Sequence, residues 1–578
     1  MSDDARLLAR LIPLKRASVS RRALLKSGVM LGVTSLLAAC QTAPPAPPTA
    51  APKTETKPAA PPPAASPAAS PAPGASPAAS PAAAAPAAPA AQPAAAAARP
   101  AGRLVYANPS KLRTLDTITQ YGLQEFQISR QIMEPLVDLD QTGKLIPVLA
   151  ESWTATDGGK TWTFKLRRNV KFHDGSPFDA KSVQATIKRA KTATISQHKF
   201  AFVDFEDEPV QIVDDFTVAF KSKLPTATLP YNLVTVYIQP AAISSDPKYD
   251  KEPANQAIGT GPFKLVKFNV DGDTQLEANT AYWQPGLPKV GELIHRPVIE
   301  PAALVAAVKA GEVDLAEGIS VDFVPGLKSD PNLQLIQSNL WQIDFFILNT
   351  TYAPLSQPKV RQAINFAIDR DVLTKDVYGA GTPIATYPPK GLVGYSAKLP
   401  ANPYDPNKAK ALLKEAGLES GFDLEIVFPA GTYIKDKEIS QFVGDQLKKV
   451  GIRATVVSGE ANATRNGYRE GKYQMGMLSS IAVTGDADRY MQERIVQDIN
   501  KSGYKDDRVI PLIKQAASET DNAKRTALYE QIQEIMWEGP PVIYLYQIDW
   551  TYAARKAVQG FTWMPNRIFT LMTVAKSG

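Results

Sequence analysis

The residues that most often carry bond chemistry are scarce in this chain of 578 residues. The three histidines, His173, His198 and His295, are far apart in the sequence and lack the short spacings of metal-binding histidines. The single cysteine, Cys40, lies in a leader segment rather than in the long body of the chain. The sequence therefore predicts neither a metal site nor a thiol nucleophile in the body.

Paired carboxylates at Asp486 and Asp488 are the pattern that general acid–base catalysis could use. Acidic residues just before a helix also serve as helix caps, and we interpret the pair in that way. The sequence contains no serine-hydrolase elbow, no zinc-protease motif and no phosphate-binding glycine loop. We therefore expect a protein that is not an enzyme and has no cofactor, with an exported hydrolase as the alternative.

A segment near the N-terminus, from Ser20 to Cys40, has the three parts of an export signal. Paired arginines open it, an apolar run too short to span a bilayer follows, and small residues precede the cysteine. Its start resembles a twin-arginine signal, and LAAC at 37–40 resembles a bacterial lipobox, in which the cysteine is lipidated after cleavage. We predict export within residues 1–39 and lipid anchoring through Cys40, with an ordinary secretory signal as the alternative.

Residues 40–102 consist almost entirely of Ala, Pro, Ser and Thr. This composition buries too little apolar surface to fold, so we predict a disordered tether, serving as a spacer or as a glycosylated stalk. Residues 1–102 also hold the basic excess, with 10 Lys and Arg against 3 Asp and Glu, which leaves 54 of each sign in residues 103–578. A body without net charge does not favour nucleic-acid binding, which relies on an excess of basic residues.

The body of the chain is long enough for two or three packed units. Trp162, Phe164 and Leu166 alternate with polar residues, which predicts a half-buried strand, and Asp179 is placed to cap the following helix. Farther along, strands and helices alternate, which is typical of an α/β unit. The strands are predicted at 423–428, 453–458, 473–478 and 541–546, and the helices at 301–310, 405–417, 436–450 and 520–537.

Residues 149–183, LAESWTATDGGKTWTFKLRRNVKFHDGSPFDAKSV, resemble the signature region of the extracellular solute-binding proteins of peptide and nickel ABC importers, known as family 5. Further motifs typical of the family follow in its order, so the resemblance covers essentially all of residues 103–578. These motifs are GTGPFK at 259–264, LNTTYAP at 348–354, VRQAI at 360–364, YDPNK at 404–408 and LKKVGI at 447–452.

The resemblance implies an α/β, two-lobed periplasmic-binding-protein-like (Venus flytrap) fold with an extra inserted subdomain in lobe one. The expected division places lobe one at 103–342 and 547–578, the inserted subdomain at 148–255 and lobe two at 343–546. The two chain crossings form a hinge, and a solute in the cleft favours the closed form, which docks on the transmembrane subunits of an ABC permease. We expect a monomer, held outside the cytoplasm by its lipid on the cytoplasmic membrane or in the periplasm.

The resemblance identifies the fold more closely than it identifies the solute. Peptide binders of the family hold the α-amine with an aspartate and, in the dipeptide branch, the carboxylate with an arginine. In this sequence Val483 and Ala430 occupy those positions, and no acidic residue occurs from Met475 to Gly485. We therefore expect a peptide-like solute other than an ordinary dipeptide, with oligosaccharide, opine or nickel, which the family also binds, as alternatives.

The resemblance also suggests which residues line the cleft. Aromatic and polar side chains of the early loop, the crossing strand and lobe two are candidates, because they can stack on or hydrogen-bond to a solute. The predicted ligand-binding residues are Gln120, Tyr121, Trp341, Tyr387, Ser480 and Asp486.

Overall fold

The computed structural model describes residues 100–577 apart from 120–121, 195, 197, 247 and 249–256. The predicted export signal, Cys40 and nearly all of the predicted tether lie outside the described residues, as do Gln120 and Tyr121. Among the residues that the structure describes, no helix has both the length and the apolar character needed to cross a bilayer.

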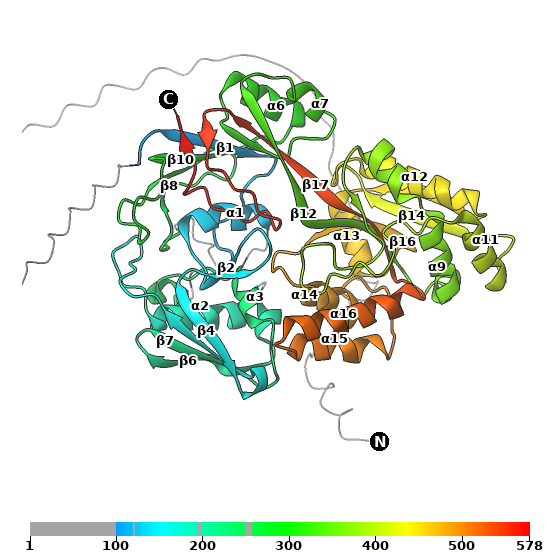
Figure 1. Cartoon of the computed structure of the whole chain (residues 1–578), viewed down its shortest axis with the longest axis horizontal. Coiled ribbons are helices and arrows are strands. Elements are labelled where there is room, and N and C mark those ends of the chain that lie inside the picture. The colour runs from blue at the N-terminus through cyan, green and yellow to red at the C-terminus, as the bar shows by residue number, and fades with distance from the viewer. Residues whose placement is uncertain are drawn as a thin grey trace, which may run out of the picture. The chain divides into compact units, whose positions relative to one another are not determined.

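Two long antiparallel strands, β12 (Leu333–Leu348) and β17 (Val542–Arg555), pair along most of their length and run through the centre of the main sheet (Figure 1). β12 also pairs with β16 (Met475–Ile481), and β17 pairs with β11 (Leu315–Glu317). The two strands therefore join the predicted lobes, and the predicted boundaries at 342/343 and 546/547 fall inside them. Those boundaries stay a prediction.

The main sheet has eleven strands within the described residues. On one side of the central pair, parallel strands alternate with helices, as the sequence predicts. On the other side β1 pairs in parallel with β10 and β11, and antiparallel strands complete the sheet. The remaining strands are β15 (Arg453–Gly459), β14 (Asp423–Pro429), β1 (Arg103–Asn108), β10 (Glu292–Pro297), β9 (Thr274–Ala278), β8 (Phe263–Lys267) and β13 (Thr382–Pro383).

The helices around β14 and β15 begin and end where the sequence predicts, within a few residues. The Asp405 carboxylate accepts hydrogen bonds from the amides of Asn407 and Lys408, which caps α11. Gly451, with φ of 98°, follows the end of α12 in the left-handed conformation that favours glycine. The helices of this part are α8 (Ala353–Ser356), α9 (Pro358–Ala367), α10 (Arg370–Val372), α11 (Pro406–Glu415), α12 (Asp436–Lys449), α13 (Ala461–Arg469), α14 (Asp488–Met491), α15 (Val509–Ser518) and α16 (Asn522–Trp537).

A separate four-stranded sheet within residues 150–222 lies inside the range predicted for the inserted subdomain, 148–255, whose bounds stay a prediction. Trp162, Phe164 and Leu166 of its strand β5 (Thr161–Leu166) are buried, which confirms the alternation seen in the sequence. Asp179 accepts a hydrogen bond from the Ser182 amide at 2.9 Å and so caps α2 (Ala180–Thr192) as predicted. The other strands of this sheet are β4 (Ala150–Thr156), β6 (Phe205–Asp214) and β7 (Thr217–Ser222).

The remaining elements are short or flank the first strand. They are α1 (Leu123–Ile132), α3 (Leu229–Leu233), α4 (Ala241–Ser244), α6 (Pro301–Ala310), α7 (Val324–Leu327), and the strand pairs β2 (Val137–Leu139) with β3 (Leu145–Pro147) and β18 (Val558–Gln559) with β19 (Ala575–Lys576).

Candidate binding site at the central strands

Two cavities lie on opposite faces of the β12–β17 pair. Successive side chains of a strand point to opposite faces of a sheet, so neighbouring residues of β12 serve different cavities. Trp341 lines one cavity, whereas Gln342 and Asp344 line the other. We call these the Trp341 cavity, of about 790 Å³, and the Asp344 cavity, of about 480 Å³.

The Asp344 cavity takes its walls from both sides of the central pair. Residues of β16 and of the loop before α12 form one wall, and residues near β1, α1 and β11, together with the C-terminal segment, form the other. Its lining residues are Pro109, Ser110, Gln124, Pro301, Gly318, Ser320, Asp322, Gln342, Asp344, Tyr378, Gly431–Lys435, Ser479, Ile548, Trp550 and Arg567.

Asp344 is the most unusual member of this lining, because its side chain is only 2% exposed and yet carries an ionisable group. Its Oδ2 accepts a hydrogen bond from the Tyr546 hydroxyl at 2.7 Å, while its Oδ1 is buried without a hydrogen-bond partner. The Ser479 hydroxyl lies beside the carboxylate and donates to the Ile343 carbonyl at 3.3 Å. Burial raises the pKa of Asp344 to about 6, and the nearby Ser479 and Tyr546 hydroxyls oppose that rise.

Two further polar atoms of the same cavity are buried without partners. The Gln342 amide nitrogen donates to the Ser479 hydroxyl at 2.9 Å, which leaves the amide oxygen of Gln342 unpaired. The indole nitrogen of Trp550 is an unpaired donor. Buried polar groups are normally hydrogen-bonded, so a cavity with two unpaired acceptors and one unpaired donor is suited to a polar guest.

The wall near Trp550 is held in place by a buried polar network. The Arg567 guanidinium lies over the Trp550 ring at 4.1 Å and forms a salt bridge with Glu317 at 2.7 Å. Glu317 also accepts hydrogen bonds from the Gln127 amide, at 3.0 and 3.1 Å, and from the Tyr106 hydroxyl. Because these groups bind one another, the wall is organised before any solute enters.

The cations that line the Asp344 cavity already have acidic partners. Arg567 pairs with Glu317, and Lys435 pairs with Asp322 at 3.1 Å. Among the described residues, by contrast, no lysine, arginine or histidine forms a salt bridge with Asp344. The cavity therefore contains one buried carboxylate whose charge is not balanced by a neighbouring cation.

The Trp341 cavity is larger, but its polar groups are mostly paired. The Asp549 carboxylate accepts hydrogen bonds from the Asn339 amide at 2.8 Å and from the Gly381 backbone amide at 3.1 Å. The Gln547 amide nitrogen donates to the Leu340 carbonyl at 2.8 Å, while its amide oxygen has no partner. Trp341 itself is 2% exposed, so it presents little surface to this cavity.

Three of the predicted ligand-binding residues, Tyr387, Ser480 and Asp486, line a third and much smaller cavity of about 30 Å³. Asp486 is buried in a salt bridge with Arg525, and it accepts a hydrogen bond from the Asp488 amide at 2.8 Å. The N-cap residue of α14 is Ala487 and no side chain caps this helix, so the interpretation of the acidic pair as a helix cap is wrong, and Asp486 instead forms a buried ion pair. Trp341 does not line this small cavity, and all four residues stay predictions as ligand contacts.

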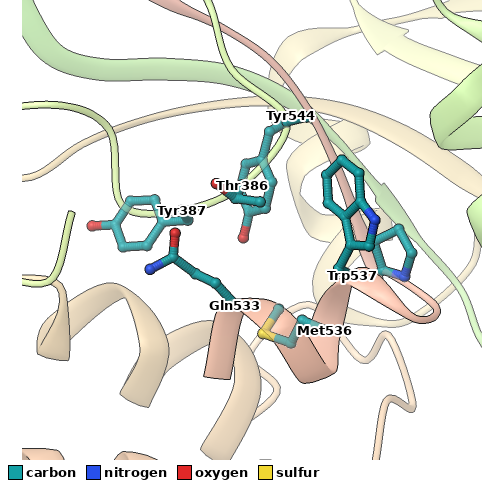
Figure 2. Close-up of a pocket in the computed structure, with 8 residues that line it drawn as sticks. Thr386, Tyr387, Gln533, Met536, Trp537 and Tyr544 are labelled. Carbon is teal, nitrogen blue, oxygen red and sulfur yellow. The ribbon is translucent and has the colours of Figure 1, made fainter. Parts of the chain in front are cut away.

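Tyr387 stacks on Tyr490 with ring centroids 4.0 Å apart, and its hydroxyl is buried without a partner. Figure 2 shows the residues around a further recess beside Tyr387, next to the end of α16. The volume of this recess is about 10 Å³. That volume suits about one water molecule and no solute. The labelled residues around this recess are Thr386, Tyr387, Gln533, Met536, Trp537 and Tyr544.

Sequence reasoning missed Asp344, Gln342 and Ser479. The signal was present in β12, where Gln342 and Asp344 are polar residues spaced by two within the run LWQIDFFIL at 340–348. An acidic residue in the middle of a buried strand is unusual and indicates a function or a partner. The partner strand β16 places Ser479 directly opposite Asp344.

The histidines show no arrangement for metal binding. Each has Nε2 within hydrogen-bond distance of a protein oxygen: Gly261 O at 3.0 Å for His173, Thr117 O at 3.0 Å for His198 and Asn108 Oδ1 at 3.2 Å for His295. Burial lowers the pKa of each histidine to about 4. Within the described residues, no cluster of three or more His, Cys, Asp or Glu side chains could hold a metal ion.

Known proteins resemble this chain over most of its length. The family model described as bacterial extracellular solute-binding proteins, family 5 Middle, matches residues 144–497. The glutathione-binding protein GsiB of Shigella flexneri serotype 5b (strain 8401) is 31% identical over 484 residues, which cover 81% of this chain and 93% of that protein.

Two solved structures share the fold at 25% identity and a TM-score of 0.71. One is the periplasmic binding protein AgaA in complex with agropinic acid, from A. tumefaciens R10, with 82% of this chain and 99% of AgaA covered. The other is the binding protein DppA from Helicobacter pylori in complex with the peptide STSA, with 83% of this chain and 98% of DppA covered.

The fold is therefore the two-lobed α/β fold of periplasmic binding proteins, with an extra subdomain inserted in lobe one. The chain belongs to family 5 of the bacterial extracellular solute-binding proteins, which serve ABC importers.

Proposed function

We propose that this chain captures a peptide-like solute in the Asp344 cavity and delivers it to the transmembrane subunits of an ABC permease. The observation that carries the proposal is the cavity itself, because residues from both sides of β12 and β17 line it and several of their polar atoms lack partners. A solute that contacts both walls would favour the closed form of the two lobes by the contacts that only this form provides.

The peptide-like class is supported by the names of the relatives. GsiB is a glutathione-binding protein and DppA was solved with a tetrapeptide, whereas AgaA, solved with agropinic acid, supports the opine alternative. The volume of about 480 Å³ lies within the range of roughly 300–1,000 Å³ that is usual for small-molecule sites. An opine, an oligosaccharide or a nickel complex remains the alternative for the same site.

Isothermal titration calorimetry of the full chain tests the solute class. The panel consists of glutathione, the peptide Ser-Thr-Ser-Ala, agropinic acid, a neutral trisaccharide and nickel with histidine. We expect binding of glutathione or the tetrapeptide, compaction in small-angle scattering on binding, and recovery of the solute unchanged. Binding of only the sugar, the opine or the metal complex would replace the peptide class, and conversion of the solute would contradict a binding function.

We further propose that Cys40 carries a lipid that holds the chain at the membrane, since it ends an export signal of lipoprotein type. The Cys40→Ser variant should leave the membrane fraction or accumulate with its signal uncleaved. Thr42→Ala, two residues after the cysteine, is the matched control and should stay membrane-bound. A Cys40→Ser chain that is processed at the same site and remains in the membrane would contradict the anchor.

A further inference from the structure

We propose that Asp344 selects the solute by pairing with a protonated amine, so that the transported compound is an amine-bearing, amide-containing molecule. This inference rests on the proposed function, and it adds both the residue and the charged group that this residue recognises. The family resemblance placed the amine anchor ahead of Asp486, where Val483 stands. The structure offers a carboxylate from a different strand.

The first argument is the state of the carboxylate. One oxygen of Asp344 accepts a hydrogen bond from the Tyr546 hydroxyl, the other is buried without a partner, and the residue lines the cavity. A buried carboxylate is costly unless it is paired and hydrogen-bonded. A cationic donor that enters the cavity would supply both the missing charge and the missing hydrogen bond.

The second argument is the charge of the surroundings. The groups packed around Asp344 are the tyrosines Tyr378, Tyr433 and Tyr546, the serine Ser479, and the acidic side chain of Asp436 on α12. None of these is a cation, and the negative charge of Asp436 adds to that of Asp344. Arg465 and Arg494 lie near Tyr433, but neither forms a salt bridge with Asp344 among the described residues. Lys435 and Arg567 are bound to Asp322 and Glu317, so neither balances Asp344.

The third argument concerns the other end of the solute. Each cation among the described residues of the lining has an acidic partner, so these residues offer little for a free carboxylate. The unpaired indole N–H of Trp550 and the unpaired amide oxygen of Gln342 instead match the carbonyl and N–H of an amide group. Tyr433 also lines the cavity, and an aromatic ring is a favourable neighbour for a cation.

The test compares ligands that differ only in charge at one end. Glutathione and Ser-Thr-Ser-Ala are titrated into the full chain in three forms: free, acetylated on the amine and amidated on the C-terminal carboxyl group. A charge-assisted hydrogen bond to a buried carboxylate corresponds to about a 10- to 100-fold change in affinity. We expect acetylation of the amine to weaken binding by that factor and amidation of the C-terminus to change it by less than about threefold.

Variants place the effect on one residue. Asp344→Asn keeps the shape and removes the charge, and it should weaken the free amine by the same 10- to 100-fold while leaving the acetylated ligand nearly unchanged. Asp549→Asn, on the opposite face of the same strand pair, is the matched control and should bind like the wild type. The acetylated ligands probe the wild-type chain, so the test does not depend on the folding of a variant.

The outcomes separate the two proposals. If the free and the acetylated ligands bind equally, or if Asp344→Asn binds the free amine as tightly as the wild type, the inference fails while the solute-binding function stands. Native mass spectrometry of the purified chain adds a second readout, because a retained solute without a protonatable nitrogen would also overturn the inference alone. A chain that binds no compound in either experiment would overturn both proposals.

Discussion

The two cavities on opposite faces of β12 and β17 differ in volume and in the hydrogen bonding of their carboxylates, and the larger cavity has the fully bonded carboxylate. The Trp341 cavity is the larger, at about 790 Å³, but its carboxylate, Asp549, is hydrogen-bonded by an asparagine side chain and a backbone amide. The Asp344 cavity has about 480 Å³, and its carboxylate keeps one oxygen unpaired and buried. By volume alone, the Trp341 cavity would be the candidate solute site, whereas the unpaired polar groups indicate the Asp344 cavity.

The two carboxylates show that opposite faces of one sheet can serve different roles, one in holding the fold and one in binding a solute. A carboxylate whose oxygens are bound by its own protein contributes to the fold, as Asp549 does where it ties Asn339 to Gly381. A buried carboxylate with an unpaired oxygen is unfavourable for the solute-free fold and becomes favourable only with a guest. Because consecutive strand residues alternate between faces, one pair of strands provides both kinds of surface.

Filling each cavity with a bulky side chain should give the largest contrast. Ser320 lines the Asp344 cavity from a half-buried loop position, and Ala397 lines the Trp341 cavity from an exposed one. We expect Ser320→Trp to weaken solute binding at least about a hundredfold, because the indole occupies space that the solute needs. We expect Ala397→Trp to change it by less than about threefold, with calorimetry on the full chain as the measurement.

The reverse result would exchange the roles of the two cavities. Circular dichroism and the thermal midpoint of each variant show whether either substitution disturbs the fold instead of the site. If Ala397→Trp removed binding and Ser320→Trp did not, the solute would occupy the Trp341 cavity despite its paired polar groups.

Much of the fold could be predicted from the sequence, because local signals there agree with the final packing. Asp405 and Asp179 cap the helices that they precede, and the alternation around Phe164 identifies its strand. The central pair was harder to predict. A strand was expected only at 541–546, yet β17 continues to Arg555, because its pairing with β12 and β11 extends it beyond its most apolar part.

The candidate site depends on strand register, which a sequence without an alignment does not reveal. The predicted Trp341 and Ser480 each lie one residue away from Gln342 and Ser479, and one residue is enough to move a side chain to the opposite face. Asp344 meets Ser479 and Tyr546 only because three strands that are distant in the sequence lie side by side. No short stretch of the sequence indicates these contacts.

The free energy of unfolding of the solute-free chain also distinguishes the carboxylates of the two cavities. The pKa of Asp344 rises from 3.8 to about 6 on folding, so between these values the folded state binds more protons than the unfolded state. Stability therefore falls as the pH rises through this window, by up to about 3 kcal/mol for a shift of this size. Asp344→Asn lacks this loss, and we expect it to be more stable than the wild type by about 1–2 kcal/mol at pH 7.

Asp549→Asn should show the opposite sign, because an asparagine cannot accept from the Gly381 amide and the Asn339 side chain as a carboxylate does. We expect a loss of about 1 kcal/mol, as for other buried or half-buried hydrogen bonds. Urea unfolding of solute-free protein at pH 4 and pH 7 measures both variants. An Asp344→Asn chain that is less stable than the wild type at pH 7 would mean that the carboxylate holds the fold rather than the solute.

The last expected effect, of only about tenfold, is the pH dependence of binding. With a pKa of about 6, Asp344 is mostly ionised at pH 7 and about one-tenth ionised at pH 5. A peptide α-amine, with a pKa near 8, stays mostly protonated over this range, so the site and not the ligand titrates. If the pair needs an ionised carboxylate, the affinity for an amine-bearing solute should be about tenfold lower at pH 5 than at pH 7.

Burial also raises the pKa of Asp488 to about 6, so the wild-type profile alone does not identify the group. The Asp344→Asn variant does, because its weaker binding should no longer depend on pH between 5 and 7, whereas Asp549→Asn should keep the wild-type profile. A tenfold pH dependence that persists in Asp344→Asn would assign the titration to another carboxylate. The charge of Asp344 would then not distinguish its cavity from the Trp341 cavity.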